Sequence, residues 1–102
     1  MKIVGVTSCP SGVAHTYMAA ESLQKAGKEK GIEVYVETQG ASGADDVLTK
    51  EQIAEADFVV LTNDTSIRGT ERFKGKKVVQ MSATKIIEKA PALMHKLQGM
   101  TE

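Results

Sequence analysis

The sequence predicts an α/β fold, in which one open sheet of four parallel strands carries helices on both of its faces. Two observations predict this fold. Short apolar runs rich in Val and Ile alternate with longer segments of helical periodicity, and most of those runs lack the polar alternation of a half-exposed strand. The 102 residues, of which 41% are hydrophobic and 25% charged, fit a single domain that spans residues 1–102.

The first part of the chain predicts a strand, a helix and a second strand. The run from Ile3 to Thr7 is typical of a strand that is buried on both faces. Helical periodicity extends from about Val13 to Lys30, and Gly31 is well placed to end that helix in a left-handed conformation. The second strand, Ile32 to Thr38, alternates in part between apolar and polar residues, a pattern that suits an edge of the sheet.

A short helix is expected after a loop over residues 39–46. Its start is marked by Thr49 and Gln52, which have the spacing of a capping box, in which each side chain bonds the backbone N–H of the other residue. Leu48 and Ile53 fit the hydrophobic contact that accompanies such a helix start.

The remainder predicts two more strands and a final helix. Asp57 to Thr62 is a third buried strand, and residues 63–75 form a long polar connection with one helical turn in it. Lys77 to Met81 is a fourth strand. The last helix runs from about Ala83 to Gln98, and Pro91 is expected to kink or restart it because proline lacks a backbone N–H.

The alternation of strands and helices implies right-handed crossovers and the strand order 2-1-3-4, as in three-layer sandwiches of the Rossmann-like or flavodoxin-like kind. Ligands of such sheets bind beyond the carboxyl ends of the strands, where the strand order reverses. Here that point lies between the first and third strands, so the loops Thr7–Thr16 and Asn63–Thr65 should meet there.

Charge and cysteine content exclude several classes of function. The formal net charge is zero, which disfavours electrostatic binding of nucleic acid or anionic lipid. One cysteine cannot form an internal disulfide, and neither a signal peptide nor an apolar run of about 20 residues is present. We therefore expect a cytoplasmic protein that is not inserted in a membrane and serves any membrane process through a partner.

The loop after the first strand has the features of an anion site. Cys9 lies just before a helix start, where unpaired backbone N–H groups and the helix dipole favour a phosphate-sized anion and a thiolate. Gly12 allows close approach of the backbone. The expected phosphoryl-binding groups are the amides, with some side-chain donors, of Ser11, Gly12, Val13, Ala14, His15 and Thr16.

Two further residues are candidates to contact the bound anion. His15 either bonds locally at the helix start or lies against the phosphoryl group. Asp64 follows the third strand at the switch point and is a candidate to face the site. Two distant histidines and one cysteine have no metal-ligand spacing, so we expect neither a metal nor a cofactor.

A cysteine loop that binds phosphate has two main uses. A cysteine phosphatase of the low-molecular-weight kind needs Cys-x5-Arg and an aspartate before a proline, but His15 occupies the arginine position and no aspartate precedes either proline. A carrier that accepts and holds a phosphoryl group fits the loop better. A non-catalytic binding or regulatory domain on the same fold remains an alternative.

The stretch from Val6 to Glu21, VTSCPSGVAHTYMAAE, resembles the phosphorylation signature of the fructose-type IIB family of the bacterial sugar phosphotransferase system. VETQG, at residues 36–40, resembles a second hallmark, and the similarity covers nearly the whole chain, with a more polar stretch than usual at residues 63–69. The resemblance implies that a phosphohistidine on a IIA protein phosphorylates Cys9. Cys9 then passes the group to a sugar, of the fructose, mannose or mannosyl-glycerate type, held by membrane protein IIC at the inner face of the membrane.

Overall fold

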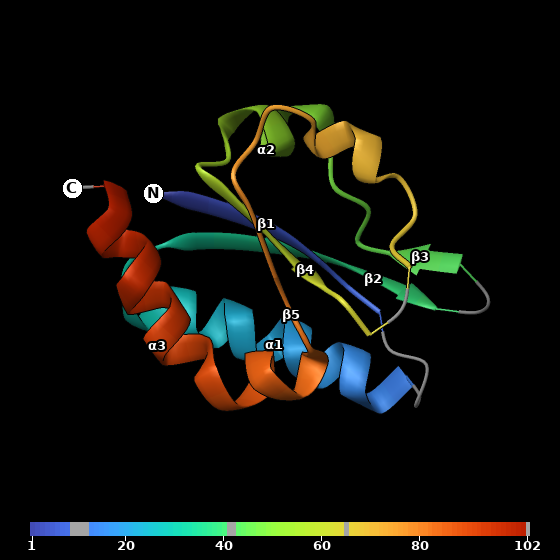
Figure 1. The fold of residues 1–102 in the computed structure, drawn as a ribbon, viewed down its shortest axis with the longest axis horizontal. Coiled ribbons are helices and arrows are strands. Elements are labelled where there is room, and N and C mark those ends of the chain that lie inside the picture. Colours follow the sequence, from blue (N-terminus) through green and yellow to red (C-terminus); the bar gives the residue numbers. More distant parts are fainter. Residues whose placement is uncertain (9–12, 41–42, 65, 102) are drawn as a thin grey trace.

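The computed structural model describes residues 1–8, 13–40, 43–64 and 66–101, and the side chains of residues 13–15 and 101 lie outside the description (Figure 1). The described elements are β1 (Lys2–Thr7), α1 (Val13–Glu29), β2 (Glu33–Gly40), β3 (Gly43–Asp45), α2 (Lys50–Glu55), β4 (Phe58–Thr62), the 3-10 helix η1 (Thr70–Phe73), β5 (Val78–Met81) and α3 (Ala83–Thr101).

The sheet has the strand order β3-β2-β1-β4-β5. β2, β1, β4 and β5 pair in parallel, so the four predicted strands and their predicted order are confirmed. The prediction of a purely parallel, four-stranded sheet is wrong in one respect. β3 pairs antiparallel with the end of β2, at residues that we expected in a loop, and makes the sheet mixed. All three residues of β3 are exposed, so it has no apolar pattern by which a sequence could reveal it.

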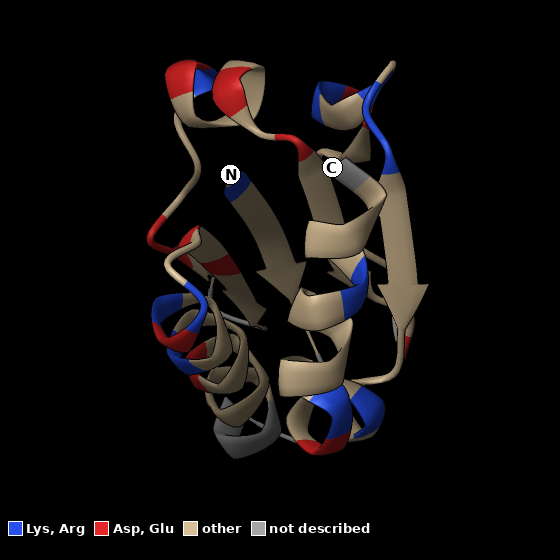
Figure 2. Cartoon of the chain, turned by 90° about the vertical axis from the view of Figure 1, so that its left-hand side faces the viewer, with Lys and Arg blue, Asp and Glu red and all other residues tan. Residues whose placement is uncertain are grey.

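Helices cover both faces of the sheet, as predicted (Figure 1). α1 and α3 lie together on one face, over an apolar core that includes Ile3, Leu23, Phe58, Ile86 and Leu97. α2 and η1 lie on the other face, over a smaller core that includes Val4, Val59 and Phe73. Charged residues of both signs are interspersed over the helices and connections, while the strands carry few of them (Figure 2).

Two helix termini have the predicted local structure. After α1, Gly31 has φ of +72°. The N–H of Ile32 bonds the carbonyl of Gly27 and the N–H of Gly31 bonds that of Lys28, which together form a Schellman motif. Before α2, Thr49 and Gln52 form both hydrogen bonds of the capping box.

Helix α3 continues through Pro91, so a restart at that residue is not observed. Pro91 is exposed, whereas Ala90, Leu93 and Met94 in the same stretch of the helix are buried in the core. That burial stabilises the helix although Pro91 cannot donate to the carbonyl four residues earlier. Among the described residues, no helix is both long and apolar enough to cross a membrane.

Candidate functional site

The candidate site lies where the parallel strands end. β1 and β4, neighbours in the sheet, end at Thr7 and Thr62, and this junction is the predicted point where the strand order reverses. β1 ends here, and the next element, α1, begins at Val13. Cys9, Ser11 and Gly12, three of the predicted site residues, lie outside the described residues.

Buried threonine hydroxyls fix the chain on both sides of the segment 9–12. Before it, Thr62 Oγ1 accepts a hydrogen bond from the N–H of Ser8 and donates one to the carbonyl of Ser8, both at 2.9 Å. Around it, Thr7 Oγ1 donates to the carbonyl of Thr16 at 3.0 Å and so ties the end of β1 to the first turn of α1. All three threonines are buried. Ser8, which precedes Cys9, is therefore held to β4, and the end of β1 is held to the first turn of α1.

The first turn of α1 is electrostatically suited to an anion. The helix has 17 residues, and its first turn contains no acidic side chain to compete for the unpaired N–H groups. Val13, Ala14, His15 and Thr16 form that turn, and all four were predicted to hold a phosphoryl group. Thr16 is buried, and the side chain of His15 lies outside the description, so the two interpretations of His15 stay open.

Asp64 lies just beyond β4 and bonds the start of α3. Its Oδ2 accepts a hydrogen bond of 2.6 Å from the N–H of Ala83, the first residue of that helix. Ser82 Oγ accepts a further one from the N–H of Lys85. Asp64 thus helps to cap α3, and its orientation toward the anion site stays a prediction.

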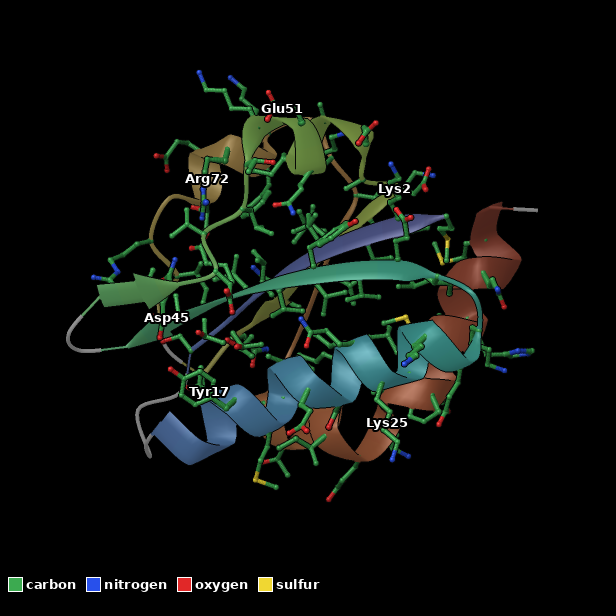
Figure 3. All side chains as sticks on the ribbon, turned by 180° about the vertical axis from the view of Figure 1, so that it is seen from behind. Lys2, Tyr17, Lys25, Asp45, Glu51 and Arg72 are labelled. Carbon is green, nitrogen blue, oxygen red and sulfur yellow. The ribbon has the colours of Figure 1, made fainter. Side chains whose placement is uncertain are left out.

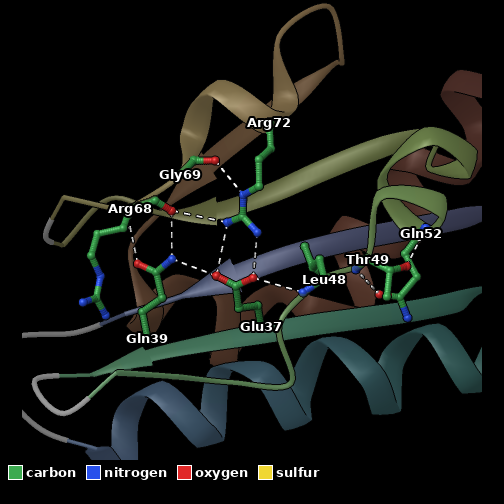
Figure 4. Close-up of polar contacts among 8 residues, drawn as sticks. All are labelled: Glu37, Gln39, Leu48, Thr49, Gln52, Arg68, Gly69 and Arg72. Carbon is green, nitrogen blue, oxygen red and sulfur yellow. Dashed lines mark hydrogen bonds and ion pairs between the residues drawn. The ribbon is translucent and has the colours of Figure 1, made fainter.

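A buried ion pair that sequence reasoning missed stabilises the adjoining edge of the sheet (Figure 4). The Glu37 side chain is only 2% exposed and forms a bidentate pair with Arg72, with distances of 2.8 and 3.1 Å. The N–H of Leu48 donates to Oε1 of the same carboxylate, and Nε2 of Gln39 donates to Oε2. Four N–H donors from three residues therefore converge on one carboxylate.

Gln39 and Arg68 extend this network toward the end of β2. The Gln39 amide bonds both backbone groups of Arg68, each at 2.9 Å, and Nη2 of Arg68 donates to the carbonyl of Gly40. Arg72 Nε also donates to the carbonyl of Gly69 at 2.7 Å. The connection from β4 to η1 is thereby fastened across the carboxyl edge of the sheet.

The network determines the ionisation of Glu37. Burial alone would raise the pKa of this carboxyl, but the hydrogen bonds from Arg72, Gln39 and Leu48, with the charge of Arg72, outweigh burial and hold the pKa below its ordinary value. The bond to Glu37 in turn raises the pKa of Arg72. Glu37 is therefore a structural carboxylate, ionised at neutral pH.

The chain is similar to known proteins over most of its length. Residues 4–96 match the family model described as "PTS system, Lactose/Cellobiose specific IIB subunit". The chain is 53% identical, over 96% of its length and 92% of the relative's, to the fructose-like EIIB component 2 of Escherichia coli K12. It is 43% identical to part of the fructose-specific EIIABC component of Bacillus subtilis, of which it covers 15%. The solution structure of an enzyme IIB subunit from E. coli K12 superimposes with a TM-score of 0.91, at 35% identity, over 98% of this chain and 93% of that one.

Proposed function

Because the chain belongs to the IIB family of the bacterial sugar phosphotransferase system, in its fructose-type branch, we propose that Cys9 is the residue that carries the phosphoryl group. The protein is a phosphoryl carrier of this system and a phosphotransferase component. Cys9 is its only thiol. The observation that supports Cys9 most strongly is the pair of threonine anchors, Thr62 and Thr7, which hold Ser8 before the segment 9–12 and Thr16 after it.

The transfer to Cys9 is a nucleophilic displacement at phosphorus. The Cys9 thiolate attacks the phosphorus atom of a phosphohistidine, an S–P bond forms and the P–N bond breaks, and its electron pair remains on the imidazole nitrogen. The negative charge on the equatorial oxygens is stabilised by fixed donors. We assign that role to the amides of Ser11, Gly12, Val13, Ala14 and His15 and to Thr16, since α1 begins among these residues.

The donor and the acceptor follow from the arrangement of the relatives. IIB domains of this family occur fused with IIA and IIC components, as in the EIIABC protein of B. subtilis, which implies IIA and IIC partners. In this proposal a IIA phosphohistidine loads Cys9, and a sugar bound by IIC unloads it at the cytoplasmic face of the membrane. Fructose is the proposed sugar because curated relatives are fructose-like or fructose-specific.

Onward transfer tests this proposal. The protein is phosphorylated with phosphoenolpyruvate, the general phosphotransferase proteins and a fructose-type IIA, and is then mixed with vesicles that contain or lack the matching IIC. We expect fructose phosphate to form only in the presence of IIC. Mannose is offered in parallel as the alternative sugar, and fructose should be the preferred acceptor. Gly12→Val serves as the variant that fills the proposed cradle, and it should fold but accept little phosphate. Discharge without IIC, or normal loading of Gly12→Val, would contradict the proposal.

A further inference from the structure

A pocket of about 390 Å³ lies at the carboxyl ends of β4 and β5, within the range of roughly 300–1,000 Å³ that is usual for small-molecule sites. Leu61 of β4 pairs directly with Gln80 of β5, so both side chains project from the same face of the sheet. That face carries α2 and η1, because Leu61 belongs to the core beneath them. The connection after β4 completes the lining through Asn63, Ser66, Ile67 and Thr70.

The lining of this pocket is polar but uncharged. Leu61 and Ile67 supply aliphatic surface, and hydroxyl or amide groups come from Thr62, Asn63, Ser66, Thr70 and Gln80. Within the described part of the chain, all of these polar side chains except that of Thr62 lack a hydrogen-bond partner. Hydroxyl and amide groups can both donate and accept, so they are available to a ligand that also does both.

The charged side chains of the same connection are bonded elsewhere. The Asp64 carboxylate accepts a hydrogen bond of 2.6 Å from the N–H of Ala83, and Nη2 of Arg68 donates to the carbonyl of Gly40 at 3.1 Å. Neither residue lines the pocket. An anionic ligand would therefore find no cation in the lining, and a cationic ligand no carboxylate. The lining suits a neutral molecule that carries several hydroxyl groups.

The wall formed by the connection is fixed by the buried Glu37 network. Gln39 bonds both backbone groups of Arg68, and Nε of Arg72 donates to the carbonyl of Gly69. These two anchored residues lie between Ile67 and Thr70, which line the pocket. Figure 3 shows Arg72 projecting from η1 toward the sheet. Because the wall is held in place by these bonds, a ligand would pay little conformational entropy to order it.

We propose that this pocket binds the sugar that accepts the phosphoryl group, as a neutral ketohexose, and that this domain thereby selects the sugar together with IIC. Thr62 lines the pocket and also holds Ser8, the residue before Cys9, through two hydrogen bonds. The pocket thus adjoins the segment that contains the carrier residue. This inference rests on the proposed function, since the sugar is the acceptor in that reaction, but binding itself requires neither a phosphoryl group nor IIC.

Sugar binding to the unphosphorylated protein, without partner proteins, tests this inference. Fructose and, in parallel, fructose 1-phosphate are titrated into ¹⁵N-labelled protein, and the amide chemical shifts are followed. We expect saturable shifts at residues 61–63, 66–70 and 80, with a dissociation constant for fructose in the millimolar range. Fructose 1-phosphate should bind no more tightly than fructose, because the lining offers no cation to its phosphate.

Two variants and a matched control test whether the binding occurs in this pocket. Gln80→Leu removes an amide from the lining, so the dissociation constant for fructose should rise roughly 3- to 10-fold. Ser66→Phe fills the pocket from an exposed position and should abolish the shifts. Gln24→Leu, at an exposed glutamine of α1, should bind fructose as the wild type does.

The possible outcomes separate this inference from the proposed function. The inference would be overturned if fructose gave no saturable shifts at these residues up to about 100 mM. Tighter binding of fructose 1-phosphate, unchanged binding by Ser66→Phe, or equal weakening by Gln24→Leu and Gln80→Leu would also overturn it. Saturable binding of fructose by a protein whose Cys9 accepts no phosphoryl group would instead refute the proposed function alone.

Discussion

Replacing Glu37 by Gln should destabilise the protein far more than a surface substitution of the same kind. Two donors converge on each carboxylate oxygen of Glu37: Arg72 and Leu48 on Oε1, and Arg72 and Gln39 on Oε2. Glutamine offers one acceptor oxygen, so at most two of these four hydrogen bonds survive. Its NH₂ group then faces two donors that it cannot accept from.

The expected magnitude follows from this count. Losing two hydrogen bonds that involve charged groups corresponds to about 3–6 kcal/mol, and breaking a buried ion pair to about 3–5 kcal/mol. The Arg72 side chain is 26% exposed, so water can solvate part of its charge after the substitution. We therefore expect a loss near the lower end, about 3 kcal/mol of the roughly 5–15 kcal/mol available to a domain of this size.

Guanidinium unfolding followed by circular dichroism at pH 7 measures this loss. In thermal unfolding of the same variant, the melting temperature should fall by about 12 °C or more, because each kcal/mol of lost stability lowers it by about 4 °C or more. Glu21→Gln, at an exposed position in α1, is the matched control and should stay within about 0.5 kcal/mol of wild type. Arg72→Met should cost more than Glu37→Gln, because it leaves a charged carboxylate that is only 2% exposed without its cation.

The same experiment at acid pH tests the sign of the electrostatics. The folded state holds the pKa of Glu37 below its ordinary value of 4.5. The contribution of the Glu37 carboxylate to the free energy of unfolding is thus fully present above pH 4.5. It is lost as the pH falls through the lowered pKa of the folded state. The stability difference between wild type and Glu37→Gln should therefore shrink on acidification below pH 4.5. A loss under about 1 kcal/mol at pH 7, or a difference that grows in acid, would refute the reasoning.

Three further predictions concern single residues. Thr62→Val removes both hydrogen bonds to Ser8, so stability should fall by about 1–3 kcal/mol and loading should slow; a normal loading rate would exclude a positioning role. Gly27→Ala should lower the melting temperature despite better helix propensity, because its Cβ would lie 2.3 Å from Cγ2 of Val34, and a stabilised variant would contradict this packing. The Cys9 thiol should show a pKa below about 8.5 in pH-dependent alkylation with iodoacetamide, and a value at or above that would exclude an activated thiolate.

The parts of the fold that the sequence predicts are those with strong local signals. Each central strand is a continuous apolar run because both of its faces are covered, and the capping box at Thr49 needs only residues three apart. The strand order follows from right-handed crossovers. β3 could not be predicted, because its three exposed residues are held by pairing with β2 and not by any pattern of their own.

Glu37 shows why the site was predicted only in part. Partial alternation along β2 predicted only a strand at an edge of the sheet, whereas the connection to η1 covers one face of that strand and buries the Glu37 carboxylate. Its partner Arg72 lies 35 residues away, in a segment predicted only as a polar connection with a helical turn. The contact of Thr62 with Ser8 likewise depends on the pairing of β1 with β4, which no local motif reveals. The strand before Cys9 and the helix start after it have local signals of their own, and both elements are confirmed.

The identity of the phosphorylated residue tests the central claim most directly. Wild type, Cys9→Ser and His15→Ala are incubated with phosphoenolpyruvate, the general phosphotransferase proteins and a fructose-type IIA, and the phosphoryl group is counted by intact mass and located by peptide mapping. Serine is nearly isosteric with cysteine, but its hydroxyl is far less acidic and is not a comparable nucleophile. We predict one phosphoryl group on Cys9 in the wild type, none on Cys9→Ser, and slower loading of Cys9 in His15→Ala. A phosphorylated Cys9→Ser protein, or a phosphoryl group stably bound to His15, would contradict the assignment of Cys9 as the carrier.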